Sequence, residues 1–174
     1  MNKAEDDKLK GLCPHGNHPN SCETCLAENN EWLKEIVEAQ PEFIWTIETP
    51  DKHYGLVVKL PHQCVISGTL NIEDKSMKID MFMVNERLRG KGVGAKLLTE
   101  LAKQAKEYEA KILFGHVTSK SALVTRAKVF GQVNLRFYSP HSGEKIEKSF
   151  EEIMSEKSNL IEGNLDYLVA VELK

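Results

Sequence analysis

The sequence predicts a mixed α+β fold, in which one central and mostly antiparallel sheet of about seven strands is flanked by helices. Four short β-prone segments, separated by proline or turn residues, follow one another between Glu42 and Val84. A long amphipathic helix and another strand come next, and a strand–helix–strand unit of about thirty residues predicts a parallel pair. The length of 174 residues indicates one main domain with a small appendage.

The first half of the chain contains one helix and four strands. Trp32, Ile36 and Val37 lie on one face of a predicted helix that Pro41 ends. Turns follow at Pro50–Lys52, at Pro61 and at Glu73–Ser76. The predicted elements are the helix Ala27–Gln40 and the strands Glu42–Thr49, His53–Leu60, Gln63–Ile72 and Met77–Val84.

The second half alternates helices and strands. Its clearest helix has an apolar stripe that includes Leu97, Leu98 and Leu101, and Gly131 is placed to end the next helix. The predicted helices are Val93–Ala110, Ser119–Phe130 and Glu144–Glu156, and the predicted strands are Lys111–Thr118, Val133–Tyr138 and Tyr167–Leu173.

Composition excludes several classes of protein. Hydrophobic residues make up 41% of the chain and the net charge is −3, so no overall basic excess points to nucleic acid or to an anionic membrane. The charged N-terminal residues lack the apolar core of a signal peptide, and no apolar run is long enough to span a bilayer. We therefore expect a cytoplasmic protein without a membrane or nucleic-acid partner, whose cysteines are thiols or metal ligands.

The N-terminal segment predicts a small metal site. We expect a disordered tail over residues 1–12, a zinc-knuckle-like segment over residues 13–26 and the main domain over residues 27–174. Cys13 and His15 form one pair of potential ligands, and Cys22 and Cys25 form a second pair with CxxC spacing. The loop between the pairs has almost nothing to bury, so it needs a staple to hold a fold. Tetrahedral Zn²⁺ on these four side chains, with no open coordination position, would be structural.

Three other interpretations of the knuckle remain open. His18 is an alternative ligand to His15. Cys22 and Cys25 are alternatively a redox pair, although the βαβ context of such a motif is missing. In the last interpretation the cysteines bind no metal. The segment has no Lys or Arg to neutralise phosphates, so contact with a protein is favoured over contact with nucleic acid.

The most informative stretch is the basic, glycine-rich turn between the fourth strand and the long helix. Glycines at positions 90, 92 and 94 allow sharp bends and a close approach of a ligand. The helix that opens near Gly92 presents unpaired N–H groups and the positive end of its dipole. Arg87, Arg89 and Lys91 add positive charge at the same place. This combination predicts a cradle for a phosphate or pyrophosphate.

The turn fits one phosphate motif and not two others. A P-loop needs a second glycine where Ala95 stands and a Ser or Thr after Lys96, and the spacing G-x-G-x-x-G also fails. Arg89-Gly90-Lys91-Gly92-Val93-Gly94 matches the pattern R/Q-x-x-G-x-G/A. On these residues the chain resembles the GNAT family, the Gcn5-related N-acetyltransferases, from about the second strand to the C-terminus.

The resemblance implies an acetyl-CoA-dependent N-acetyltransferase with a small-molecule or protein amine as acceptor. It implies that the two strands of the parallel pair splay apart and that the pantetheine arm enters the gap, bonded to backbone like an added strand. The residues implied to bind the cofactor are Phe82, Met83 and Val84 for pantetheine, and Arg89, Gly90, Lys91, Gly92, Val93, Gly94 and Ala95 for the pyrophosphate.

The catalytic residues are harder to assign. Asp80 and His116 are candidate general bases on the parallel strands, and Tyr138 is a candidate acid. For Asp80 and His116, an ordinary hydrogen-bonded strand residue is an equal interpretation. The family often carries a Tyr four residues before the glycine that ends the following helix. Here that position is Ala127, and Arg126 and Lys128 are alternative contacts for the CoA phosphates.

Two departures from the family pattern support rival interpretations. Ala127 is compatible with an acyl-CoA-binding domain that has lost turnover. The knuckle is compatible with a protein-interaction module. The long excursion over Ser139–Asp166 replaces a simple hairpin. It either covers the acceptor groove or makes a homodimer contact, so the resemblance does not identify the acceptor.

Overall fold

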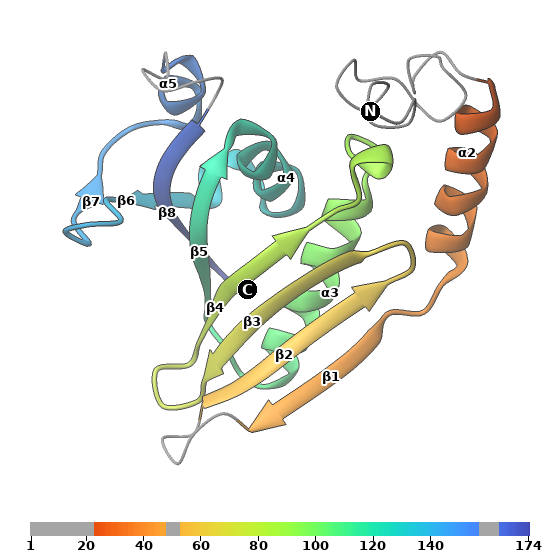
Figure 1. Ribbon diagram of the computed structural model, residues 1–174. Helices are drawn as coiled ribbons and strands as arrows, with labels where there is room; N and C mark the ends of the chain where they lie inside the picture. The colour runs from red at the N-terminus through yellow and green to blue at the C-terminus, as the bar shows by residue number, and fades with distance from the viewer. Residues whose placement is uncertain (1–22, 48–52, 157–163) are drawn as a thin grey trace, which may run out of the picture.

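The computed structural model describes residues 23–47, 53–156 and 164–174 of the chain. Figure 1 shows one continuous sheet with a long helix, residues 93–107, behind it. In the first half, the elements are α2 (Glu23–Glu38), β1 (Glu42–Ile47), β2 (His53–Leu60), β3 (Cys64–Asn71), β4 (Ser76–Met83), the 3-10 turn η1 (Glu86–Leu88) and α3 (Val93–Glu107). In the second half, they are β5 (Ile112–Ser119), α4 (Lys120–Phe130), the 3-10 turn η2 (Gln132–Asn134), β6 (Leu135–Tyr138), β7 (Lys145–Ile146), α5 (Phe150–Ser155) and β8 (Asn164–Glu172).

The strands form an eight-stranded sheet in the order β1-β2-β3-β4-β5-β8-β6-β7. All neighbouring pairs are antiparallel except β4 and β5, which run parallel. This arrangement confirms the predicted mixed fold and the predicted parallel pair. The additional strand is β7, which has only two residues.

The parallel pair is short, and this shortness opens the sheet. The ladder between β4 and β5 runs from Ser76 opposite Ile112 to Ile79 opposite Gly115. Beyond these residues the two strands diverge, as Figure 1 shows. The second half of β4 therefore keeps β3 as its only partner strand among the described residues. We call the gap between the diverging halves the splay.

The core lies on one face of the sheet, where the alternation of each strand directs its apolar side chains. Leu56 and Val58 of β2 and Ile66 of β3 are fully buried there, against Leu97 and Leu101 of α3. A second buried cluster joins β5, α4, α5 and the C-terminal strands. No described helix lies over the opposite face of β1–β4 (Figure 1), which we call the open face.

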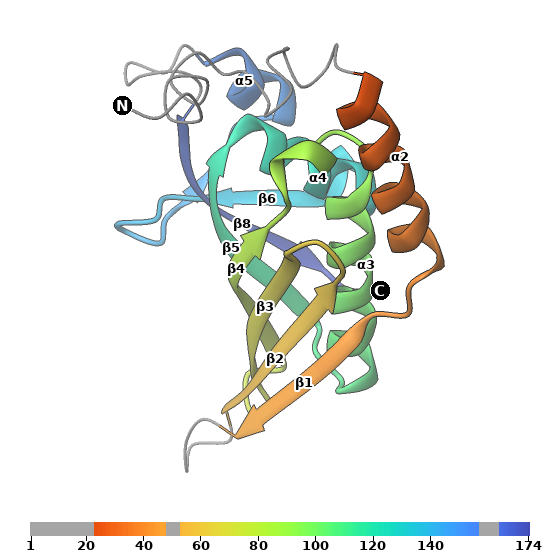
Figure 2. The ribbon, with the colours of Figure 1, turned by 45° about the vertical axis from the view of Figure 1, so that its right-hand side comes forward.

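The C-terminal end of helix α2 lies beside the first turn of α3 (Figure 2), and α2 is attached at several points. The ring of Trp32 stacks on His62 with centroids 4.4 Å apart and an interplanar angle of 10°. Lys96 of α3 donates to the carbonyl of Ile36. The helix begins at Glu23, four residues before the predicted start, so Cys25 lies on a helical turn and not in a loop.

The excursion after β6 differs most from the sequence prediction. The helix predicted over Glu144–Glu156 is wrong in its first half, because Lys145 and Ile146 form β7 and pair with β6. The turn between them is closed by Ser139 N–H donating to Glu144 O at 2.8 Å. Helix α5 starts only after Ser149, whose side chain and that of Glu152 form a capping box.

The remaining boundaries agree with the prediction to within a few residues. Strand β6 starts at Leu135, two residues late, because η2 occupies the preceding positions. The tail predicted over residues 1–12 and most of the knuckle over residues 13–26 lie outside the described residues. In the part of the chain that the structure describes, no helix is long and apolar enough to cross a membrane.

Candidate functional site

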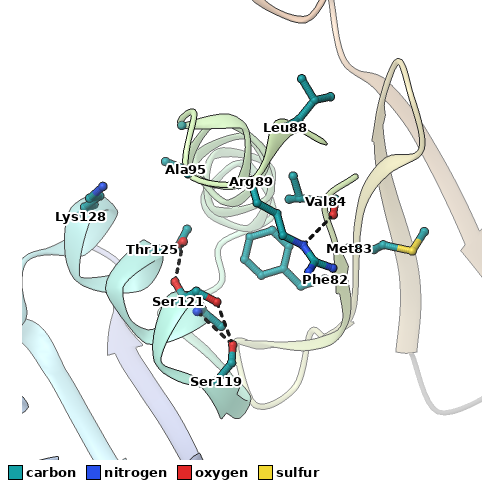
Figure 3. Close-up of a pocket in the computed structure, with 14 residues that line it drawn as sticks. Phe82, Met83, Val84, Leu88, Arg89, Ala95, Ser119, Ser121, Thr125 and Lys128 are labelled. Atoms are coloured by element: carbon teal, nitrogen blue, oxygen red, sulfur yellow. Dashed lines mark hydrogen bonds between the residues drawn. The ribbon is translucent and has the colours of Figure 1, made fainter. Parts of the chain in front are cut away.

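The candidate site is a cleft of about 430 Å³ at the end of β4. Figure 3 shows its walls: the last residues of β4, the glycine-rich turn with the first turn of α3, and one face of α4. The size is within the range of about 300–1,000 Å³ typical of small-molecule sites. Of the residues predicted to bind the cofactor, all but Lys91 and Val93 line this cleft.

The backbone of the glycine-rich turn has conformations that residues other than glycine rarely adopt. Gly90 and Gly92 have φ angles of +77° and +87°, and Gly92 is the N-cap of α3 in the left-handed conformation. The first i→i−4 hydrogen bond of the helix comes from Lys96 N–H to Gly92 O at 3.1 Å. The preceding amides, those of residues 93–95, are the N-terminal donors of the helix and lie beside the cleft.

Gly94 has a different role, because it permits close packing. A Cβ atom at this position would lie 3.2 Å from Cζ of Phe82 and 3.5 Å from Cγ2 of Thr125. The absent side chain therefore lets α3, β4 and α4 converge on the floor of the cleft.

The three basic residues of the turn do not act together. The guanidinium of Arg87 contacts the Glu28 carboxylate at 3.1 Å and lies 5.3 Å from the ring centroid of Trp32. Arg87 therefore anchors α2 and is not directed at the cleft, which corrects the expectation that it adds charge there. Arg89 and the exposed Lys91 remain on the turn.

Arg89 is the basic residue of the turn that lines the cleft. Its Nε donates to the carbonyl of Val84 at 3.4 Å, as Figure 3 shows, and its exposed guanidinium lies 3.8 Å from Glu86. Because this ion pair is exposed to solvent, little free energy is lost when a ligand anion replaces Glu86 as the partner of Arg89.

Helix α4 supplies the third wall with hydroxyl groups and one cation. Ser119 is the N-cap and accepts from Ala122 N–H. Thr125 Oγ1 donates to Ser121 O at 2.9 Å. Residues 121, 125 and 128 share one helix face by their spacing, so the exposed Lys128 also lines the cleft.

Arg126 points away from this cleft. Its side chain is 4% exposed, and one guanidinium nitrogen lies 3.3 Å from where a Cβ of Gly115 would be. Burial lowers the pKa of Arg126 to about 10. The expectation that Arg126 is an alternative contact for the cofactor phosphates is therefore wrong, whereas Lys128 is suitably placed.

The end of β4 contributes backbone groups. In a strand, successive N–H and C=O groups point to alternate sides, and from Asp80 to Met83 only β3 pairs with β4 among the described strands. The unpaired side of this stretch faces the splay. It is a short strand edge of the kind that an extended ligand can complete with hydrogen bonds.

Asp80 and His116 lie beyond the last paired residues of the parallel strands and not in the cleft itself. The register of β3 and β4 shifts between Ser67 and Gly68, so Asp80 occupies a β-bulge on the open face. Both oxygens of its carboxylate have partners: Thr69 Oγ1 donates to Oδ2 at 2.6 Å, and Lys78 Nζ lies 3.3 Å from Oδ1.

His116 is also on the open face and is half-exposed. Its Nε2 forms a hydrogen bond with Oδ1 of Asp166 in β8. Nε2 of His141 lies 3.5 Å from the other oxygen of Asp166. The sequence analysis did not find Asp166 or His141, because they are distant in sequence and only the pairing of β5 with β8 brings them to His116.

Tyr138 is farther from the splay. In the sheet register, Leu168 of β8 lies opposite both His116 and Tyr138, so these two residues share a face but are separated by one strand. Two strand spacings amount to roughly 10 Å. The structure brings Asp80 and His116 to the splay and leaves Tyr138 outside it.

The predicted zinc ligands fall mostly outside the described residues. Cys13, His15 and Cys22 lie outside them, and Cys25 is fully buried on α2. Among the residues that the structure describes, no group of three or more His, Cys, Asp or Glu side chains is arranged to hold a metal ion.

Comparison with protein families gives one match. Residues 22–131 match the family model described as "Acetyltransferase (GNAT) domain". The match covers more than half of the chain and includes the glycine-rich turn, the splay and the cleft wall on α4. None of the curated proteins compared with the chain matches it.

Solved acetyltransferase structures are also similar to this chain. An IAA acetyltransferase from Bacillus cereus is 24% identical, with 70% of this chain and 79% of that chain covered and a TM-score of 0.43. An acetyltransferase from Bacillus subtilis in complex with CoA is 14% identical, with 78% and 100% covered and a TM-score of 0.48. Such low identities and TM-scores add no argument about the reaction.

Proposed function

Because the chain belongs to the GNAT acetyltransferase family, we propose that it transfers an acetyl group from acetyl-CoA to the nitrogen of an amine. The observation that carries this proposal is the meeting of two features in one cleft. The amides at the start of α3 suit a pyrophosphate, and the unpaired edge of β4 suits an extended pantetheine arm.

In this proposal the cofactor runs from the turn toward the splay. The amides of Val93, Gly94 and Ala95 bind the pyrophosphate, with Arg89, Lys91 and Lys128 supplying positive charge around it. The backbone of residues 82–84 binds pantetheine. The thioester then lies in the splay, between the cleft on the helix side and the polar residues on the open face.

The acceptor approaches from the open face. Its ammonium group loses a proton to a base, the neutral nitrogen attacks the thioester carbonyl carbon, the C–S bond breaks, and the second proton passes to the thiolate. Positioning the two reactants supplies about 7 kcal/mol or more of the barrier reduction. We propose His116 as the base in preference to Asp80, because both oxygens of Asp80 already have partners.

Calorimetric titration with acetyl-CoA tests the cofactor site. We expect the parent protein to bind with a Kd of about micromolar order, and Gly92→Val to weaken binding at least about tenfold, because valine is strained at the φ of +87°. Gly143→Val is the matched control, since Gly143 also has a positive φ of +71° but lies in the β6–β7 turn. Absence of binding by the parent protein would contradict the proposal.

A second candidate function is acyl-CoA binding without turnover. It is favoured by Ala127, which packs against the second buried cluster at the place where the family often carries a tyrosine acid. A panel of primary amines, including phenethylamine, spermidine and a lysine peptide, distinguishes the two. Tight binding of acetyl-CoA without release of CoA in the presence of any amine would favour this candidate.

We also propose a structural zinc ion, bound by Cys13, His15, Cys22 and Cys25 in residues 13–26, ahead of an acetyltransferase domain over residues 27–174. The support for this proposal is the ligand spacing in the sequence. Its alternative is a segment that contacts a protein partner without metal.

A further inference from the structure

The excursion between β6 and β8 sends side chains to the open face from both of its ends. His141 follows β6 at the start of the excursion, and Asp166 lies near the start of β8 at its end. Asp166 contacts His116, which belongs to β5, and His141 contacts Asp166. The excursion thus reaches the proposed base directly.

The placement of Asp166 depends on an irregularity in the sheet. Val117 lies opposite Tyr167 and Ser119 lies opposite Asn164, so β8 has one extra residue against β5 at this point. A bulge of this kind redirects a side chain relative to a regular strand. Asp166 lies within it and contacts Nε2 of His116.

The contact determines which nitrogen of His116 is available as a base. An ionised carboxylate only accepts hydrogen bonds, so the nitrogen that faces it must carry a proton. Nε2 faces Asp166, and the lone pair of the neutral ring is therefore on Nδ1. The carboxylate also stabilises the imidazolium that forms when Nδ1 takes a proton.

The other ionisable groups near His116 are few in the described part of the chain. His141 lies 3.5 Å from the second oxygen of Asp166. On β4, Lys78 lies opposite Phe114 and Asp80 follows the last paired residue, and these two side chains are paired with each other. Asp166 is thus the only carboxylate in this group that contacts the ring.

We propose that Asp166 is a positioning residue, which holds His116 in the Nε2–H tautomer so that Nδ1 takes the proton of the acceptor ammonium. The proposal rests on the proposed acetyl transfer. In the step, the ammonium N–H bond breaks, Nδ1 gains the proton, and the imidazolium later releases it to solvent. His141 contacts the same carboxylate but does not receive this proton.

The first test needs no substrate. Long-range ¹H–¹⁵N spectra of the full chain, with the His116 signals assigned by loss in His116→Gln, report the tautomer directly. We expect Nε2–H in the parent protein and a mixture of tautomers in Asp166→Asn. Glu172→Gln is the control, because Glu172 is exposed on the same strand. A parent ring protonated on Nδ1, or an unchanged tautomer in Asp166→Asn, would overturn the proposal.

The second test is the pH dependence of kcat/KM with acetyl-CoA and the best amine of the panel named above. We expect Asp166→Asn to lower kcat/KM about 10- to 100-fold and to change the shape of the pH profile, because the proton acceptor loses its fixed tautomer. His141→Gln should change kcat/KM less than about twofold. A loss in Asp166→Asn that is uniform across pH would indicate a structural role and overturn the proposal.

The two proposals fail in different ways. If none of the amines tested makes the parent protein release CoA, the proposal of acetyl transfer fails. The role of Asp166 then fails with it, even where the spectra show the expected tautomer. If the parent protein is active and Asp166→Asn has the parent pH profile, only the role of Asp166 fails.

Discussion

Lys96 of α3 donates from Nζ to the backbone carbonyl of Ile36 at 2.6 Å, at the C-terminal end of α2. The same ammonium group contacts the carbonyls of Val37 and Ala39, each at 3.1 Å. These carbonyls are among those that a helix leaves without partners at its C-terminus, where a positive charge is favourable. A side chain one turn into α3 therefore holds α2 against the turn that forms the candidate site.

Replacement of Lys96 by methionine should lower stability. Three carbonyls lose their charged donor, so we expect a loss of about 1–3 kcal/mol in the free energy of unfolding, measured by urea denaturation. Lys103→Met is the matched control, because Lys103 is on the same helix and exposed. An equal loss in both variants would show that the contact to α2 contributes nothing.

Substitutions of the two arginines of the turn should have different effects. Arg89→Met should weaken acetyl-CoA binding about tenfold, measured by calorimetry, because Arg89 lines the cleft. Arg87→Met should leave the affinity within about twofold and instead lower stability, because Arg87 pairs with Glu28 and stacks over Trp32. The reverse pattern would contradict the assignment of the two side chains.

Arg126 should cost the protein stability. Burial lowers the pKa of Arg126 from its usual value to about 10, so folding disfavours the charged form at every pH below the lowered value. No acidic side chain among the described residues offsets this cost. We expect Arg126→Met to raise the free energy of unfolding at neutral pH by about 1 kcal/mol or more.

The matched control for this variant is Arg136→Met. Arg136 is exposed, and its guanidinium already donates to the carbonyl of Val133 at 2.8 Å. This control should be neutral or slightly destabilising. A loss of stability in Arg126→Met would indicate a partner for the buried guanidinium, such as water.

A hydrogen bond from Tyr167 to Glu156 should give stability a pH dependence. Tyr167 Oη donates to Glu156 Oε2 at 2.6 Å and joins β8 to the end of α5. Burial, and then the bond and charge of Glu156, raise the pKa of Tyr167 to about 12. Burial opposes ionisation of Glu156, but hydrogen bonds from Lys148 and Tyr167 hold its pKa below the usual value.

The pH dependence of stability follows from the directions of these two pKa shifts. The raised tyrosine pKa gives stability that is full below about pH 10 and is lost as the pH rises toward 12. The lowered carboxyl pKa gives stability that is lost as the pH falls below about 4.5. We expect the stability difference between the parent protein and Tyr167→Phe, about 1 kcal/mol at neutral pH, to shrink at both extremes. Tyr54→Phe, which removes a hydroxyl group from β2, is the control variant.

The proposed zinc site predicts a measurable metal content. The purified protein should contain about one equivalent of zinc by elemental analysis, and Cys22→Ser should lose most of it, because a tetrahedral site needs all four ligands. Cys64→Ser is the control, since Cys64 is buried in β3, outside the segment. A parent protein without metal would contradict the proposal.

The sequence alone determined the periodic elements of the main domain and its glycine-rich turn. Strand β2 has the predicted bounds and α3 the predicted start, because the apolar periods of strands and helices are local properties of the chain. Gly90 and Gly92 could be identified because each meets a local backbone requirement, whereas Gly94 is required by packing against Phe82 and Thr125. The short β7 and the late start of α5 were missed, although the capping box from Ser149 to Glu152 was a local signal.

Only the tertiary structure decided how the side chains are used. Arg87 and Arg89 look equivalent in sequence, but one is bound to α2 and the other lines the cleft. Asp166 had no local signal, since its pairing with His116 depends on the register of β5 and β8 and on one bulge. The apolar periodicity of the sequence indicates which face of its helix or strand a residue occupies. The partner across that face is set by strand pairing between distant segments, and that information is absent from any single stretch of chain.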